Sequence, residues 1–466
     1  DHRDLHSFPT RRSSDLWALA ILTYLTFLTM VFFARGEADR RIAILERRFG
    51  RPVTAEALGK LYYGNDRSDQ AFWDNIAKLF RACDIPYPGL CGARTLVPQP
   101  ENEARRQRIR EHEPALLAWE KAFAADIPLM AYDFTPGKLA QRLTPQYRGM
   151  RDFLYFEQWQ IAFALADGRA DDAMRAYERM KKVAGALLRE PGILGGLLWL
   201  AGQYTILDGV EIMLESERLS DAQLQRVAAD LEQAERDLPA MQEIALYSET
   251  VEMLDLFAAL GNGTYYQFQR GDIRRDTLPL RPFRFFFPQL WWYALLDQTA
   301  MAKNYNAPDF KHIPEPDFRN GKCLYLSSMF MTACQTLGQR FDAVTARLRA
   351  MRMLIAAELY RRHHGDYPET LPDMPLDPFT GQPLRYRKGP YSHFETMPPP
   401  EMNSPDAEIP MEPEVQEFTM PAVVVWSVGP DGVEGENPRG FDAKYCDDVR
   451  AIRRLGPPSP VESQKK

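Results

Sequence analysis

Hydrophobic residues form one uninterrupted run near the start of the chain. Residues 16–34 read LWALAILTYLTFLTMVFFA and carry no charged side chain. A helix of this length crosses a hydrocarbon core of about 30 Å, and its threonines can bond to the helix's own carbonyls. A buried core helix would show a polar face, which this run lacks. The pattern predicts a transmembrane helix over residues 17–34, and a single-pass protein because no later run qualifies.

Helical periodicity dominates the next part of the chain, residues 35–342. Apolar residues recur there at spacings of three and four, as in helices with one buried face. A turn at Gly168 predicts an αα-hairpin, and the lack of a second copy at a fixed period argues against a repeat array. We expect an irregular helical bundle or a solenoid-like stack. The segments that we predict as separate helices are residues 153–166, 171–188, 192–202, 221–237 and 244–260.

A third pattern begins near residue 343, where apolar positions on one helical face lead into turns and short strands. The helix is expected to end near Gly365, because glycine accepts the left-handed cap and Pro368 prevents continuation. Residues 384–387 alternate between apolar and polar, and residues 422–427 (AVVVWS) are β-branched and aromatic, so both segments predict strands. The pattern indicates a small α+β unit.

The order of motifs in this unit resembles the soluble domain of the major pseudopilins of type II secretion systems. The motifs are HGDYP at 364–368, DPFTGQPLRY at 377–386 and VVVWSVGPDG at 423–432. The resemblance implies a pseudopilin-like α+β module over residues 343–455, interrupted by an insertion at 388–420, of the kind found at the end of uncharacterised membrane-anchored bacterial proteins. The chain is therefore expected to be mainly α, with this small module at its C-terminal end.

The chain departs from the pseudopilin pattern in two respects, of which the insertion at 388–420 that splits the sheet is one. In that family a hydrophobic N-terminal helix with a processing-site glutamate leads directly into the helix of the soluble domain. Nothing comparable directly precedes residue 343 in this sequence. The resemblance therefore bears on the fold of the module and leaves assembly into a pilus open.

Acidic residues surround a glycine-rich loop (GPDGVEGENPRG) at the end of the module. Calcium takes six to eight oxygen ligands from such flexible loops. In the pseudopilin family the corresponding loop binds structural calcium beside an acidic pair, for which Asp447 and Asp448 are the nearest match. The alternative is a solvated acidic turn, the commoner use of this composition. The candidate calcium ligands are Asp431, Glu434, Asp442, Asp447 and Asp448.

Other chemistry is sparse. The sequence contains no phosphate-binding loop, nucleophile elbow, dinucleotide fingerprint, His-Glu-x-x-His or Cys-x-x-Cys motif. His363, His364 and Asp366 have the residue types of a metal site, although charge complementing a helix terminus is the commoner role. The net charge of −7, without a basic stripe, argues against a nucleic-acid partner. We predict no catalytic or cofactor-binding residues.

Both ends of the chain are set apart from the fold. Residues 1–16 (DHRDLHSFPTRRSSDL) resemble a translated sequencing-adapter oligonucleotide, so we expect an assembly artefact and exclude them from fold reasoning; the alternative is a genuine basic segment before the span. Residues 456–466 are polar and proline-containing, and we expect a disordered tail there.

The side of the membrane is predicted from two opposing signals. Arginines at 35, 40, 41, 47 and 48 follow the span, and the positive-inside rule would place them in the cytoplasm. The pseudopilin resemblance favours export. We expect a cell-membrane protein whose body lies on the extracytoplasmic side.

Two functional hypotheses follow from the sequence. The first is a membrane-anchored structural or interaction protein of the bacterial cell envelope, related to secretion and with protein partners there. The alternative is a membrane-anchored enzyme or ligand-binding protein with a site in the helical middle, in a pocket under residues 283–296. That aromatic segment (FRFFFPQLWWYALL) fits a membrane-surface or peptide-binding patch, or packing in a helical core, the commoner outcome.

Overall fold

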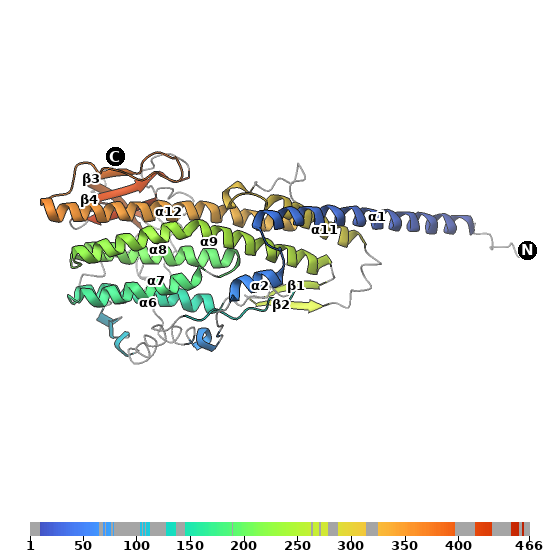
Figure 1. The fold of residues 1–466 in the computed structure, drawn as a ribbon, viewed down its shortest axis with the longest axis horizontal. Helices are drawn as coiled ribbons and strands as arrows, with labels where there is room; N and C mark the ends of the chain where they lie inside the picture. Colours follow the sequence, from blue (N-terminus) through green and yellow to red (C-terminus); the bar gives the residue numbers. More distant parts are fainter. Residues whose placement is uncertain are drawn as a thin grey trace, which may run out of the picture.

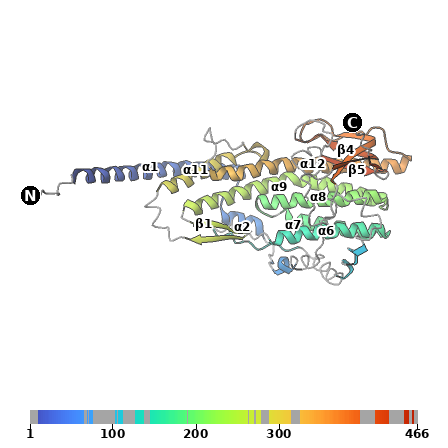
Figure 2. The same ribbon diagram turned by 180° about the vertical axis from the view of Figure 1, so that it is seen from behind.

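The structure is a computed structural model in which long helices lie side by side along one axis (Figure 1). The apolar helix α1 projects from one end, and a small sheet covers the other end (Figures 1 and 2). The architecture is mainly helical with an antiparallel sheet near the C-terminus, as the sequence pattern predicts. The structure describes residues 10–64, 69, 71–75, 78, 103–104, 106–107, 109–111, 127–136, 145–188, 190–261, 264–269, 272–277, 288–313, 325–396, 415–430, 449–455 and 459–460.

Helices account for most of the described residues. The α-helices are α1 (Thr10–Phe49), α2 (Ala55–Tyr63), α6 (Pro145–Ala166), α7 (Ala170–Leu187), α8 (Gly192–Ser216), α9 (Asp221–Gly261), α11 (Pro288–Asn304) and α12 (Tyr325–His364), and η2 (Phe310–His312) is a short 3₁₀ helix. The strands are β1 (Thr264–Gln269), β2 (Asp272–Thr277), β3 (Arg385–Thr396), β4 (Val415–Ser427), β5 (Val449–Arg454) and β6 (Ser459–Pro460).

Helix α1 carries large apolar side chains on its surface. Trp17 is 71% exposed, Leu22 62% and Phe32 75%. Among the described residues, α1 and α8 are the helices long and apolar enough to cross a membrane, but most of the apolar stretch of α8 is buried inside the body. Helix α8 is apolar because it lies in the core of the body. Helix α1 is mostly exposed, and this N-terminal apolar helix could span a membrane.

The predicted αα-hairpin is confirmed by α6 and α7. Gly168 sits between them with φ +78°, a conformation that glycine adopts without strain. Ala162 and Ala173 are buried where the helices approach. Helix α8 packs on both helices of this pair, and α8, α9 and α12 pack on each other.

Helix α9 corrects the prediction of two separate helices. Residues 221–237 and 244–260 belong to one continuous helix that contains Pro239. A proline inside a helix removes one hydrogen bond and costs about 3 kcal/mol. The buried stripe nevertheless continues across it with Leu231, Leu238 and Met241. Tertiary packing on both sides of Pro239 therefore maintains the helix.

Helix α12 joins the two parts that the sequence pattern separated near residue 343. It begins at Tyr325 and runs without a break to His364. One buried hydrophobic cluster contains Leu207 of α8, Val344 of α12 and Val423 of β4. The helical region and the C-terminal sheet therefore share both a helix and a core.

The insertion expected at residues 388–420 is shorter in the structure, because both of its ends belong to strands of the C-terminal sheet. Strands β3 and β4 pair antiparallel from Arg385↔Trp426 to Thr396↔Val415, so residues 388–396 and 415–420 are strand. Pro390 and Pro421, which favoured a break in the sequence pattern, lie opposite each other in the register of this hairpin. Residues 397–414 lie outside the described part. Strand β5 pairs with the other edge of β4.

The expected C-terminal tail also contains paired residues. Ser459 and Pro460 form the short strand β6, which pairs with Thr419 and Phe418 of β4. This contact places part of residues 456–466 on the sheet, contrary to the expectation of disorder for the whole segment. The other residues of that segment are outside the described part.

Candidate functional site

Charged side chains are concentrated where the helices meet the C-terminal sheet, and we call this group the charged seam. Three of its acids lie on one face of α8, at spacings of three and four. Its arginines come from α12 and from β5. The acids of the charged seam are Asp208, Glu211, Glu215, Glu217, Asp221 and Glu358, and its bases are Arg347, Arg361, Arg362, Arg450, Arg453 and Arg454.

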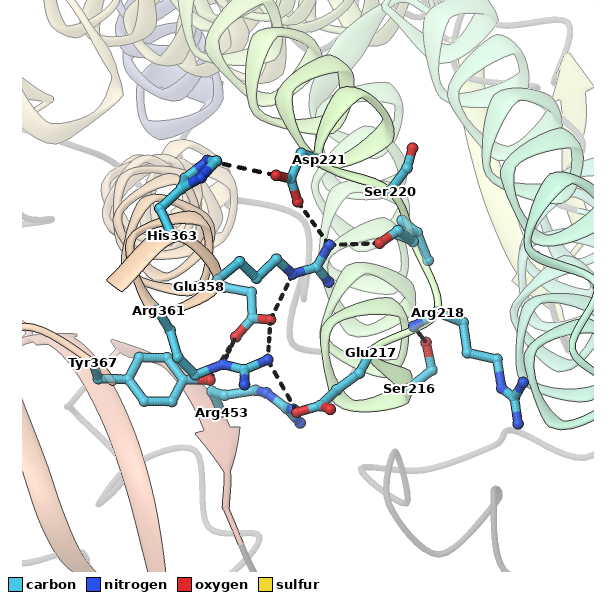
Figure 3. A network of polar contacts seen from close by, with 12 residues as sticks. Ser216, Glu217, Arg218, Ser220, Asp221, Glu358, Arg361, His363, Tyr367 and Arg453 are labelled. Carbon is cyan, nitrogen blue, oxygen red and sulfur yellow. Dashed lines mark hydrogen bonds and ion pairs between the residues drawn. The ribbon is translucent and has the colours of Figure 1, made fainter. Parts of the chain in front are cut away.

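Glu358 is the buried centre of the seam (Figure 3). Its Oε1 accepts hydrogen bonds from Arg361 Nη2 at 2.7 Å and Arg362 Nε at 2.9 Å. Its Oε2 accepts from Arg361 Nε at 2.9 Å and from the Tyr367 hydroxyl at 2.6 Å. The helix supplies both arginines because positions three and four residues on lie beside Glu358. The carboxylate is 0% exposed and fully hydrogen-bonded.

The arginines around Glu358 extend the network to other elements. Arg362 Nη1 lies 2.9 Å from Asp221 Oδ1, at the start of α9. Arg361 and Arg453 approach Glu217 Oε1 at 3.2 and 2.6 Å, so the carboxylate of Glu217 joins α12 to β5. Glu217 closes α8 with φ +55°, a backbone conformation uncommon for a residue with a side chain. The network thus fixes the α8–α9 turn against both α12 and the sheet (Figure 3).

Arg347 forms a second, deeper centre on α12. Its guanidinium group lies 2.5 Å from Asp208 and 3.3 Å from Glu211, and over the ring of Tyr204. Farther along α8, Glu215 Oε1 lies 3.5 Å from Arg454 of β5. Two helices and a strand are therefore joined here by groups of opposite charge.

The two centres shift the pKa values of their carboxyl groups in opposite directions: the pKa of Glu358 is lowered and that of Glu211 is raised. Burial raises the pKa of Glu358, but hydrogen bonds from Arg361, Tyr367 and Arg362 outweigh it and hold that pKa at about 2. Burial also raises the pKa of Glu211, which reaches about 7 because the charges of Asp208 and Glu215 add to the effect and Arg347 only partly opposes it. Glu358 is thus a stable buried anion, whereas Glu211 titrates near neutral pH.

The motif residues behind the family resemblance form the frame of the module. Asp377 accepts hydrogen bonds from the backbone N–H groups of Phe379 at 2.9 Å and Val428 at 3.2 Å, and so ties its turn to the end of β4. The Tyr386 hydroxyl donates to the carbonyl of Pro368 at 2.7 Å. These contacts give the side chains of Asp377 and Tyr386 a structural role in the module.

The structure separates the three residues that could have formed a histidine-containing metal site. His363 Nε2 lies 3.5 Å from Asp221, and the ring of His364 stacks on Tyr360. Asp366 pairs with Lys388 at 2.7 Å. Each side chain therefore contacts a different partner, as expected for charges at a helix terminus.

The candidate calcium ligands lie outside the part of the chain that the structure describes. These are Asp431, Glu434, Asp442, Asp447 and Asp448. Within the described residues, histidine, cysteine and carboxylate groups form no cluster of three or more that could hold a metal ion. The calcium prediction therefore stays a prediction.

A surface groove between α9 and α12 is the other polar feature of note. Its volume is about 340 Å³, and it lies beside Pro239. Arg349 and Arg352 both line it and both pair with Glu235, at 2.7 and 2.8 Å. Because these guanidinium groups are already paired, the groove resembles the charged seam in chemistry more than it does a ligand pocket.

Sequence reasoning missed the charged seam. The signal within reach was Glu358 followed by Arg361 and Arg362, a spacing that brings acid and base together on a helix. Its partners Glu217 and Arg453 are 236 positions apart, and no local pattern joins them.

Comparisons of the chain with protein-family models, with curated proteins and with solved structures found no match. The contacts within the charged seam are therefore the basis for assigning its role. Its carboxylates and guanidinium groups neutralise one another across several elements, and this chemistry fastens the elements together.

We expect substitutions at the two carboxylates to change stability with opposite pH dependence. Glu358 has a pKa of about 2 when folded and an ordinary value of 4.5. Its stabilising effect is therefore complete above about pH 4.5 and disappears as the pH falls toward 2. Glu211 has a pKa raised to about 7, so the stability of the native protein relative to Glu211→Gln should fall as the pH rises from about 4.5 to 7.

Unfolding of the full-length protein in detergent across this pH range measures both effects. At neutral pH, Glu358→Gln should lower the free energy of unfolding by about 2–4 kcal/mol, because it removes the buried anion that pairs with the partly exposed Arg361 and Arg362. Glu369→Gln is the control, since that carboxylate is 87% exposed on the following turn and should matter little. Equal losses for Glu358→Gln and Glu369→Gln would contradict the account.

Proposed function

We propose that this protein is a membrane-anchored structural or interaction protein of the bacterial cell envelope. The observation that carries the proposal is the placement of the two ends: the exposed apolar part of α1 projects at one end, and the C-terminal sheet lies at the other (Figure 2). The body between them acts as a spacer that holds the C-terminal module away from the bilayer.

The length and continuity of α12 support the role of a spacer. The helix has 40 residues, which at 1.5 Å per residue corresponds to roughly 60 Å. Its first half packs near η2 and α11, which lies against α1, and its second half packs against β4 and β5. A load on the sheet would therefore pass through α12 to the part of the body next to the anchor.

The order of elements supports a pseudopilin-like module. A long helix ends at His364, just before Gly365; a turn held by Asp377 follows, and an antiparallel sheet then packs on the helix. On this basis we propose that the module lies on the extracytoplasmic side and contacts protein partners related to secretion. The exposed apolar side chains of Leu376 and Leu455 are available for such contacts.

Photo-crosslinking in intact cells tests the proposed presentation of the module. With p-benzoylphenylalanine at Leu376, which is 55% exposed, we expect a discrete adduct with another envelope protein. Leu194 on α8 is the matched control, since it is 45% exposed but belongs to the helical body. No adduct at Leu376 beyond that at Leu194 would contradict presentation of the module to a partner.

Labelling of intact cells with a membrane-impermeant maleimide tests the proposed side of the membrane. Failure of this reagent to label Leu455→Cys would contradict the extracytoplasmic position of the module.

We also propose that the acidic loop of the module binds a structural calcium ion through Asp447 and Asp448. Calcium should then raise the unfolding temperature by several degrees in the native protein, because an ion bound only by the folded state stabilises it. The double variant Asp447→Ala with Asp448→Ala should lose this shift, and Glu369→Ala, an exposed acid of the same module, should keep it. A native protein insensitive to calcium and to chelator would contradict the proposal.

A further inference from the structure

Helix α11 runs alongside α1 and in the same direction (Figure 1). Near its start, the ring of Trp292 meets Phe27 edge-on at a centroid distance of 6.1 Å. One turn later, Leu295 lies in a small buried cluster with residues of α1 that follow Phe27. At its end, the carbonyl of Tyr305 accepts a hydrogen bond from Arg48 at 2.6 Å. The cluster contains Leu295, Val31, Ala34 and Ala38.

This register places the start of α11 at the level of the apolar run. Phe27 and Val31 belong to residues 17–34, which we propose to cross the membrane. Because a helix rises 1.5 Å per residue, Phe27 lies roughly 10 Å from Ala34, the last residue of that run, on its N-terminal side. A helix packed against Phe27 and Val31 therefore cannot remain wholly in water while they lie in the bilayer.

The composition of the start of α11 fits this position. From Pro288 to Leu296 the helix reads PQLWWYALL, with no charged residue before Asp297. Tryptophan and tyrosine are enriched at membrane interfaces, where the ring lies among apolar groups and the polar atom reaches water. Tyr293 is 54% exposed, and Trp292 is only partly buried. The side chain of Tyr293 therefore does not pack in the helical core, and that of Trp292 packs only partly, against α1.

A neighbouring part of α1 continues the same apolar surface. The side chains of Phe32 and Phe33 are 75% and 69% exposed, and both residues follow Phe27 along α1. The exposed aromatic residues of both helices thus occupy one short interval along the axis of α1. This continuity with the anchor identifies the bilayer as what covers them.

We propose that the start of α11, Pro288–Tyr293, is a second lipid contact, inserted at the boundary between headgroups and acyl chains. The inference rests on the proposed membrane anchoring of α1. With the packed helices α1 and α11 both in the same leaflet, the body would hold a fixed orientation on the membrane instead of rotating about a single span.

Depth-dependent fluorescence quenching tests this contact in the full-length protein. The protein, free of its native cysteines, is reconstituted into vesicles of phosphatidylethanolamine and phosphatidylglycerol and labelled with NBD at one introduced cysteine. The positions are Tyr293→Cys for the contact, Lys303→Cys as a control on the same helix, and Phe32→Cys for the anchor. Nitroxide groups are carried on the lipid headgroup or at a shallow or deep acyl carbon.

We expect the shallow acyl nitroxide to quench NBD at Tyr293→Cys at least about twofold more than at Lys303→Cys, which lies roughly 15 Å farther along α11. The label at Phe32→Cys should also be quenched by lipid nitroxides. Circular dichroism of each labelled protein checks that the helices are retained.

Each other outcome rejects a specific part of the account. Quenching at Phe32→Cys without quenching at Tyr293→Cys overturns the second contact and leaves the anchor standing. Quenching at neither position overturns the proposed anchor as well. A blue-shifted label at Tyr293→Cys that lipid nitroxides do not quench means that a protein surface, such as a second copy of the chain, covers this site, and this overturns the inference. If Tyr293→Cys fails to fold, the label at Ala294→Cys, one residue on, must meet the same twofold criterion.

Discussion

The arrangement of the C-terminal half depends on the buried carboxylate of Glu358. Removing an ion from water costs several kcal/mol, and this cost is offset only when good donors surround the charge. Arg361, Arg362 and Tyr367 provide these donors, at distances of 2.6 to 2.9 Å. The end of α12 and the turn after it are therefore held in one conformation. Through Arg361 and Glu217, the constraint extends to the α8–α9 turn and to β5.

This constraint adds to a hydrophobic core that the small sheet and the helical body share. The sheet adds Val423, Val425 and Ala451 to the core that the helices form. The charged seam adds ion pairs between β5 and the end of α8, and these ion pairs oppose sliding of the sheet over the helices. At the other end, α11 binds α1 through Leu295. A continuous path of packed helices therefore leads from the apolar helix α1 to the sheet.

Local signals in the sequence predict the local parts of this structure. The helix end at His364 follows from Gly365, whose φ is +89°, and the hairpin of α6 and α7 from Gly168. Long-range features could not be predicted. Pro239 looks like a helix end, yet packing on both sides carries α9 through it. Pro390 and Pro421 look like breaks, yet they lie opposite each other in a hairpin whose partner residues hold both strands.

The central claim is that the sheet and the helical body unfold as one unit. Native-state hydrogen exchange of the full-length protein in nanodiscs tests it most directly, because it reports the opening free energy of each segment separately. The account predicts that amides of α12 around Val344–Glu358 and amides of β4 around Val423–Val425 open with the same free energy and the same denaturant dependence. If the β4 amides exchange through an opening of clearly lower free energy while α12 stays protected, the module is an independent unit and the account is contradicted.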